Sequence, residues 1–157
     1  MATVYSVQKT KWDQNVPSEK IDTTELAGRV RVAFAEYEAA TATPLAQNDV
    51  VQMFNLPNGA RIVSGRLAHD GLGGSATLSV GYAAHTNAAG TAVSAAAAAY
   101  RAAATAVNAG AANAANTIAL GENSIVDANK DGLPVTATLG GSAGTGTIQL
   151  TMMYVVD

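Results

Sequence analysis

The sequence predicts a mainly β protein, an antiparallel β-sandwich that is jelly-roll-like and carries one alanine-rich helical insertion. Three observations support this: short segments that alternate apolar and polar residues, turn signals between them, and a long alanine tract that interrupts them. The 157 residues are enough for one domain with a sizeable core. We expect an N-terminal arm over residues 1–28 and the sandwich over residues 29–157, with the insertion at 83–116.

Alternating segments predict four strands in the first half of the sandwich. They cover residues 29–37, 49–56, 60–69 and 75–82. In the first segment Val30, Val32 and Phe34 alternate with arginines and small residues, which is typical of a strand with one buried face. In the third segment Val63 and Leu67 are expected to share one face of the strand.

Strands resume after the insertion and continue to the end of the chain. They are predicted at residues 116–121, 124–127, 134–139 and 145–156. The last segment is apolar on both faces near its end, so we expect it inside a sheet rather than at an edge. Gly140, Gly141 and Gly144 predict a hairpin that leads into it. Seven or eight strands in two sheets is close to the jelly-roll number.

The tract at residues 83–116 contains 19 alanines in 34 positions. Alanine has the highest helix propensity, so residues 92–108 are predicted to form a helix. Thr91 is suited to cap its start and Gly110 to end it.

Three larger apolar residues in this tract, Val93, Tyr100 and Val107, are spaced seven apart. In a helix this spacing places them on one stripe. The stripe would either pack on the sandwich or meet symmetry-related copies, and we expect these three residues to line a contact between subunits.

The arm is expected to be irregular or extended, because residues 1–28 hold many charges and few large apolar side chains. Its single tryptophan, Trp12, is either incidental to the composition or an anchor that fills a pocket on a partner.

Charged residues make up only 13% of the chain, about half of the usual share. Either small residues cover the surface, or copies and partners cover it, since interface cores are depleted of charge. The net charge of −3 argues against a nucleic-acid partner. Four arginines on two strands that we expect to be neighbours would be either solvated or docked on an acidic partner: Arg29, Arg31, Arg61 and Arg66.

No membrane partner is expected either, because the most apolar stretch is mostly alanine and shorter than a bilayer span. Residues 1–7 show no secretory signal, so we expect synthesis in a cytoplasm without export.

Residues suited to catalysis are scarce, so we predict no enzyme, no cofactor and no metal. The chain has no cysteine, and its two histidines, His69 and His85, fall at probable strand ends. A jelly-roll enzyme would need histidines and carboxylates that point into the barrel. Residues 127–132 match the first half of a calcium loop, but the twelfth position is Thr138 rather than glutamate. This loop is predicted to be a polar turn, with a weak calcium site as the alternative.

Several segments together resemble a family of tailed-phage structural proteins. They are GRVRVAFAEY at 28–37, DVVQMFNLPNGARIV at 49–63 with its Leu-Pro-x-Gly-Ala-Arg turn, ATLSVGY at 76–82, and the last strand at 145–156. The resemblance covers roughly residues 15–82 and 117–157, and it departs from the family in the alanine tract. It is to capsid decoration, or cement, proteins, which are compact β-sandwiches that sit on the outer face of the shell, commonly as trimers.

The resemblance implies a virion protein on the capsid exterior that binds the major capsid protein and stabilises the head. It also implies a homo-oligomer, expected to be a trimer. On this reading Lys9, Lys11 and Trp12 of the arm contact the capsid. The alternative is a head-fibre or tail receptor-binding module on the same fold, although the sequence shows no cluster of aromatic and acidic residues that would hold a sugar.

Overall fold

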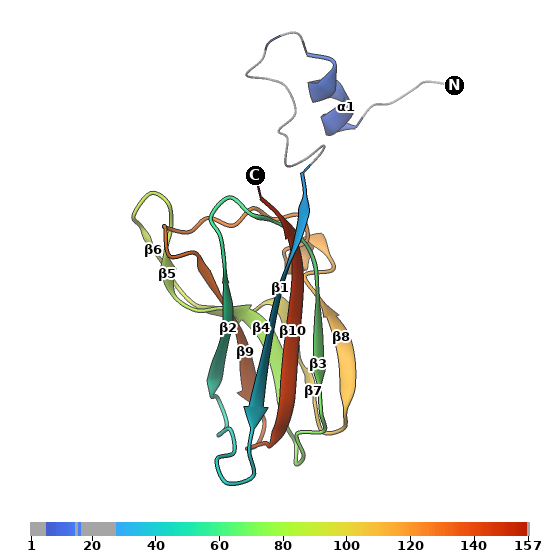
Figure 1. The fold of residues 1–157 in the computed structure, drawn as a ribbon, viewed down its shortest axis with the longest axis vertical. Helices are drawn as coiled ribbons and strands as arrows, with labels where there is room; N and C mark the ends of the chain where they lie inside the picture. Colours follow the sequence, from blue (N-terminus) through green and yellow to red (C-terminus); the bar gives the residue numbers. More distant parts are fainter. Residues whose placement is uncertain (1–5, 15, 17–27, 157) are drawn as a thin grey trace, which may run out of the picture.

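The protein is an antiparallel β-sandwich, as predicted (Figure 1). The structure, a computed structural model, describes residues 6–14, 16 and 28–156. One sheet has the order β1–β10–β3–β8: β1 (Val30–Ala39), β10 (Gly146–Val155), β3 (Arg61–His69) and β8 (Gly110–Ala114). The other has the order β2–β9–β4–β7: β2 (Val50–Leu56), β9 (Leu133–Gly140), β4 (Thr77–Tyr82) and β7 (Ala96–Thr105). A small hairpin joins β5 (His85–Thr86) to β6 (Ala92–Val93).

The strand order is that of a jelly roll. The first long strand pairs with the last, the second pairs with the last but one, and each chain connection at the start of the domain crosses from one sheet to the other. The strong strand at the C-terminus, β10, lies between β1 and β3, which confirms that it is interior. Both sheets contribute to one core between them, and its largest fully buried side chains include Leu56, Ile62, Leu67, Leu78, Leu139, Ile148, Leu150 and Met152.

The predicted hairpin before β10 is wrong. Gly140 ends β9 in one sheet and Gly146 begins β10 in the other, so the glycine-rich segment between them crosses between sheets. Gly141 has a φ of +77°, and a Cβ there would meet the carbonyl oxygen of Ser75 at 2.0 Å. A close backbone approach, rather than a two-residue hairpin turn, therefore explains the glycines.

A β-bulge changes which residues of β3 face the core. Leu67 pairs with Leu150 and Ser64 with Met153, but Ile62, not Val63, pairs with Tyr154. The extra residue, Val63, reverses the alternation beyond it. Ile62 and Leu67 are therefore both fully buried, while Val63 is half-buried, and the expectation that Val63 and Leu67 share a face is wrong.

The alanine tract does not form the predicted helix, because residues 96–105 are strand β7. Helix propensity favours alanine by only tenths of a kcal/mol per residue. As a strand, the segment pairs with β4. Without β7, the main-chain groups on that side of β4 would have no hydrogen-bonding partners from a neighbouring strand. Tyr100 also points into the core from this strand and is only 5% exposed. Tertiary pairing therefore outweighs the local preference.

Two other predicted strands are absent. Residues 118–120 form a 3-10 helix, η2 (Ile118–Leu120), which Thr117 caps. Residues 124–127 make only an isolated bridge, between Ile125 and Arg61.

Residues 7–12 of the arm form a short helix, α1 (Val7–Trp12), rather than an irregular or extended segment. The hydroxyl of Ser6 accepts a hydrogen bond from the amide of Lys9 and caps the helix. Among the described residues, no helix has the length and apolar character needed to cross a membrane.

Candidate interaction surface

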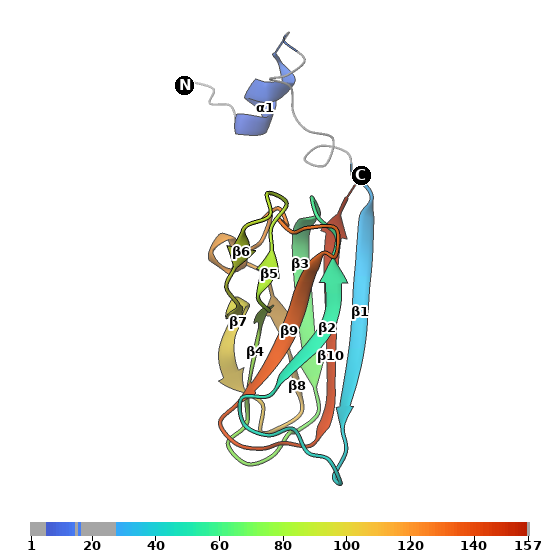
Figure 2. The same cartoon turned by 90° about the vertical axis from the view of Figure 1, so that its left-hand side faces the viewer.

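The outer face of β1 carries three exposed apolar side chains in a row. Val30, Val32 and Phe34 are 54%, 61% and 59% exposed, although the sequence predicts that this face is half-buried. The alternation is real, but it is the alanines between these residues that face inward: Ala33 packs against the core. At the margin of the sandwich, β1 contacts β2 of the other sheet (Figure 2). The inward positions of β1 hold Ala33, Ala35 and the partly exposed Tyr37.

The apolar side chains of β1 border a shallow hollow on the outer face of the sheet. Its volume is about 440 Å³, and Val32 and Met153 form its apolar part. Arg66, Asn113 and Asn116 supply polar groups from β3 and from β8 and the residues just after it. Met153 is 40% exposed. Apolar side chains rimmed by hydrogen-bonding groups are typical of a protein-binding surface.

The same face becomes polar toward the opposite end of β1. A second hollow, of about 560 Å³, is lined by Glu36, Arg66 and His69 among others. The amide of Gln149 donates to the carboxylate of Glu36 at 2.6 Å. The carboxylate of Asp70 accepts from the amide of Thr147 at 3.0 Å, and the His69 ring lies 2.8 Å from the Asp70 carbonyl. His69 and Asp70 therefore hold the strand end together.

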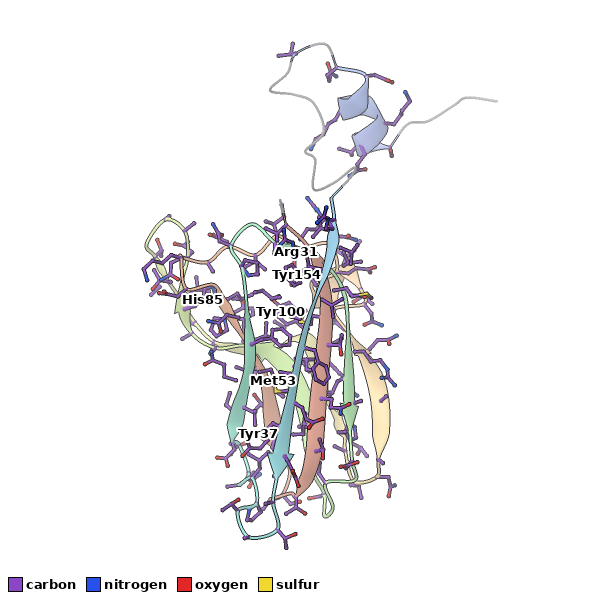
Figure 3. The ribbon with its side chains drawn as sticks, viewed as in Figure 1. Arg31, Tyr37, Met53, His85, Tyr100 and Tyr154 are labelled. Atoms are coloured by element: carbon purple, nitrogen blue, oxygen red, sulfur yellow. The ribbon has the colours of Figure 1, made fainter. Side chains whose placement is uncertain are left out.

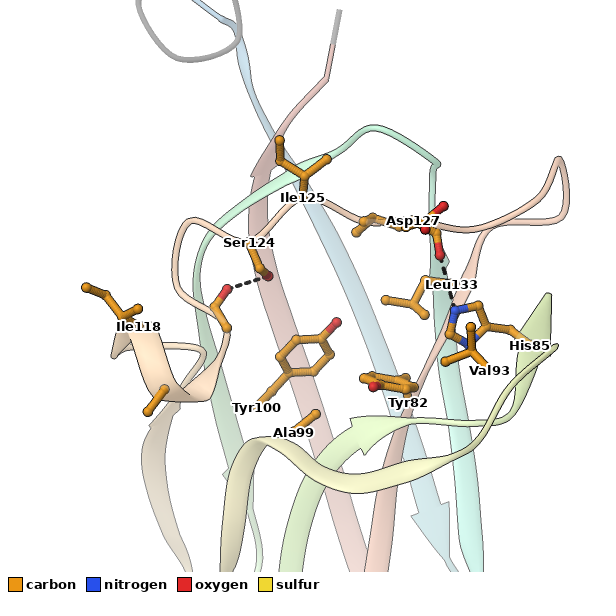
Figure 4. Close-up of a pocket in the computed structure, with 13 residues that line it drawn as sticks. Tyr82, His85, Val93, Ala99, Tyr100, Ile118, Ser124, Ile125, Asp127 and Leu133 are labelled. Carbon is orange, nitrogen blue, oxygen red and sulfur yellow. Dashed lines mark hydrogen bonds between the residues drawn. The ribbon is translucent and has the colours of Figure 1, made fainter. Parts of the chain in front are cut away.

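A third hollow, of about 480 Å³, lies at one end of the sandwich (Figure 4). Tyr82 is at its centre, with ring centroids 5.4 Å from His85 and 6.1 Å from Tyr100. Asp127 lies on the far side of His85. The structure thus assembles a group of aromatic side chains with a carboxylate, which the sequence analysis did not find, because these residues lie up to 45 positions apart.

His85 and Tyr100, in this hollow, are not arranged for catalysis. Both ring nitrogens of His85 lie 3.2 Å from main-chain carbonyl oxygens, of Ala83 and Asp127. Burial, and then the neighbouring Tyr82, raises the pKa of the Tyr100 phenol well above its ordinary 10.0. A neutral phenol and a ring fastened to the backbone can bind a ligand, but they do not form a nucleophile and base.

The raised pKa of Tyr100 predicts a loss of stability in alkali. The unfolded phenol ionises near pH 10 while the folded one keeps its proton, so the free energy of unfolding is unaffected below pH 10 and falls as the pH rises above it. We expect Tyr100→Phe to flatten this decline in melting temperature between pH 9 and 11, and Tyr37→Phe, which lies outside the hollow, to leave it. An equal alkaline loss in the Tyr100→Phe variant would contradict the assignment.

The calcium-like loop forms a polar turn whose oxygens are already engaged. The Asp127 carboxylate accepts from the amide of Ala88 at 3.0 Å, and Asp131 pairs with the Lys130 ammonium. The pKa of the Asp131 carboxyl is lowered by this hydrogen bond and charge. The side-chain oxygen of Asn129 accepts from the amide of Asp131, which is a local Asx turn. In the part of the chain that the structure describes, no cluster of three metal-ligating side chains occurs.

The three residues predicted to share a helical stripe do not share one. Val93 and Tyr100 line the end hollow, whereas the carbonyl of Val107 approaches the turn at Gly73. Tyr100 is nearly inaccessible, so it supports the core rather than presenting a surface to another subunit.

The predicted capsid-contact residues lie on α1. Lys9 pairs with Asp13 one helical turn away, and Lys11 is half-buried. The side chain of Trp12 lies outside the described residues.

The arginines expected on neighbouring strands are separated, because β10 lies between β1 and β3. Arg29 and Arg31 stand at one end of β1, whereas Arg66 points from the middle of β3 into the hollows of the outer face. Arg61 begins β3 at the same end as Arg29 and Arg31, because its partner Val155 also pairs with Val30, so only Arg66 is remote from the others.

Comparisons place this fold among solved phage capsids. No protein-family model and no curated protein matches the chain. A chain of the capsid asymmetric unit of the cyanophage Pam1 is 22% identical, with a TM-score of 0.59, and the match covers 84% of this chain and 88% of that one. A chain of the Ralstonia phage GP4 capsid is 20% identical, with a TM-score of 0.61 and coverages of 85% and 88%.

A third match is to an acid-stable capsid structure of the Helicobacter pylori bacteriophage KHP30, with 18% identity, a TM-score of 0.52 and coverages of 81% and 87%. Identities this low establish likeness of fold. The chain therefore has a β-sandwich fold that chains in the capsid structures of three different bacteriophages share.

Proposed function

We propose that this protein is a capsid decoration protein, which binds the outer face of the major capsid protein lattice of a bacteriophage and stabilises the head. The observation that carries the proposal is the likeness over more than four-fifths of the chain to chains found in phage capsid structures. Each of those chains is itself covered almost entirely, so the likeness concerns whole chains rather than a shared fragment.

The surface of the sandwich suits such a role. It offers an apolar strip with polar rims on one sheet, and the described residues present few charges that would need to be desolvated on docking. A protein that bridges adjacent capsomers gains affinity from several weak contacts at once, and an oligomer, here proposed to be a trimer, multiplies the effect. Position on the capsid exterior and synthesis in the host cytoplasm follow from this proposal.

The arm is proposed to make part of the capsid contact through Lys9, Lys11 and Trp12. We expect deletion of residues 1–20 to abolish co-sedimentation with empty heads of the parent phage. The sandwich should remain folded, because its core lies entirely within residues 39–155. Occupancy would be measured by pelleting and the fold by circular dichroism.

The exposed substitution Lys130→Glu, on a loop outside the arm, is the matched control and should pellet like the unaltered chain. Unchanged occupancy of the truncated chain would remove the arm from the contact. If the full-length chain stays in the supernatant, the proposal that it is a decoration protein is contradicted.

The aromatic hollow favours a second candidate function, a receptor-binding module of the virion. The half-buried Tyr82 contacts the buried Tyr100 at a tilt of 60°, and Asp127 lines the same hollow. An aromatic ring with polar groups beside it is the type of site that holds a sugar ring. Binding on a glycan array that Tyr82→Ala removes and Tyr37→Ala retains would favour this alternative over decoration.

A further inference from the structure

We propose that β1 pairs edge to edge with β1 of a second copy of this chain, antiparallel and symmetric about Phe34, so that two four-stranded sheets become one of eight strands. This goes beyond the decoration role and does not depend on it. It assigns an occupant to a strand that, among the described residues, has a hydrogen-bonded neighbour on one side only.

β1 is an edge strand without the usual protection. Its ten residues pair with β10 in unbroken register, with no bulge; they contain no proline or lysine, and their three charged residues, Arg31, Glu36 and Glu38, lie toward the ends. Its outer face is the exposed strip of Val30, Val32 and Phe34. A long, regular and apolar edge is a template for pairing with another strand, and proteins normally blunt or cover it. By contrast, β2 at the corresponding edge of the other sheet is interrupted by a bulge.

The hydrogen bonds of β10 show which main-chain groups of β1 are free. The carbonyl of Thr147 accepts from the amide of Asp70 at 2.9 Å, and its amide donates to the Asp70 side chain, so both groups point away from β1. Because the direction alternates along an antiparallel strand, every second residue of β1 bonds to β10 and those between them do not. The free groups therefore belong to Val30, Val32, Phe34, Glu36 and Glu38.

The same five residues carry the outer-face side chains, so the pairing that joins the free main-chain groups also sets these side chains opposite one another, with the two Phe34 rings at the centre. A two-fold axis perpendicular to the sheet relates the two copies of β1. The outer faces of both copies then lie on the same side of the combined sheet. The register centred on Phe34 pairs all five residues: Phe34 meets the partner's Phe34, and Val32 meets the partner's Glu36. Registers shifted by two residues leave a free group at each end.

The charges of β1 select a second copy in antiparallel orientation. Arg29 and Arg31 stand at one end of the strand, and Glu36 and Glu38 at the other (Figure 3 labels Arg31 and Tyr37 near these ends). Within residues 6–14, 16 and 28–156, no ion pair involves Arg29, Arg31 or Glu38. The two arginines alternate with the outer-face residues, so they project from the opposite face to the two glutamates. Antiparallel self-pairing therefore brings oppositely charged strand ends together without direct Arg–Glu pairs, whereas parallel in-register pairing would set like charges side by side on one face.

The first test is the molar mass of the whole chain, by size-exclusion chromatography with light scattering. We expect an even multiple of the 15.8 kDa chain mass, which Val32→Pro halves. Proline at position 32 removes an amide hydrogen that β10 does not use, so the sandwich should keep its melting temperature. If a three-fold contact exists elsewhere on the chain, the expected species is a hexamer that falls to a trimer.

Should Val32→Pro fail to fold, Phe34→Lys answers the same question, because this outward side chain is 59% exposed. The matched control is Val50→Lys, an exposed valine on the edge strand of the other sheet, which should leave the mass unchanged. A monomer, or an odd-numbered oligomer that neither β1 variant alters, would overturn the proposal.

The second test uses the absence of cysteine from the chain. In the proposed register the two Phe34 Cα atoms face each other as a hydrogen-bonded pair, about 5.5 Å apart, which a disulfide can span. Phe34→Cys should therefore form a covalent dimer under mild oxidation much faster than Val50→Cys. Equal rates would overturn the symmetric register. If the chain pellets with phage heads but fails both tests, the decoration role remains supported and only the β1 contact is contradicted.

Discussion

Replacing Gly81 with alanine is expected to destabilise the sandwich more than any other single methyl group added to a strand. A Cβ at Gly81 would lie 1.9 Å from the carbonyl oxygen of Ala96 and 2.6 Å from the carbonyl carbon of Ala97. Both atoms are backbone, so no side chain can rotate away. Either β7 lifts from β4 or the core shifts, and we expect a loss on the order of 3 kcal/mol, or roughly 10 °C in melting temperature.

Hydrogen exchange locates the damage, because detachment of β7 would expose the amides of residues 96–105 before those of β10. Gly110→Ala is the matched control: it also adds a methyl group to a strand glycine, but the nearest atom is 3.6 Å away, on the His69 ring. It should be neutral or slightly stabilising. Equal stability of the two variants would contradict the close packing of the alanine strand on β4.

Leu150→Ala should cost about 2–5 kcal/mol, whereas Phe34→Ala should cost less than about 1 kcal/mol. Leu150 is fully buried on the central strand β10, while Phe34 is 59% exposed although it is the larger side chain. The two residues belong to neighbouring strands, with Leu150 directly opposite Ala35. The comparison therefore tests which face of the β1–β10 pair points into the core.

Urea unfolding at the lowest usable protein concentration is the appropriate measurement, because an interface between copies then contributes least to the apparent stability. A large loss for Phe34→Ala under these conditions would mean that the face of β1 is reversed, and it would remove the apolar strip on which the β1 contact depends. A small loss for Leu150→Ala would contradict the central position of β10.

Much of the architecture could be predicted from local patterns. Alternation located β1, β2, β3, β4, β9 and β10 within a few residues, and the apolar character of both faces placed β10 inside a sheet. These predictions succeed because a strand that packs against a core must repeat its apolar side chains every second residue. The resemblance to phage structural proteins agrees with the fold likeness to phage capsid chains.

The sequence could not show in which direction each pattern points. Val30, Val32 and Phe34 read as a buried face, but in the folded chain it is Ala33 and Ala35 that face inward on β1. Val63 and Leu67 have the spacing of one face, but a bulge changes the alternation between them. The hollow of Tyr82, His85 and Tyr100 likewise arises from loops and strands that only the folded chain brings together.

Local sequence thus determined where most of the strands lie and that the chain forms a sandwich, because periodicity is a property of neighbouring residues. The tertiary structure alone decided the state of the alanine tract, the outward face of β1 and the composition of the end hollow. Each of these depends on the free energy of contacts between distant segments. Pairing β7 with β4 satisfies main-chain groups of both strands, although the register shifts twice, and that gain exceeds the small helix preference of each alanine.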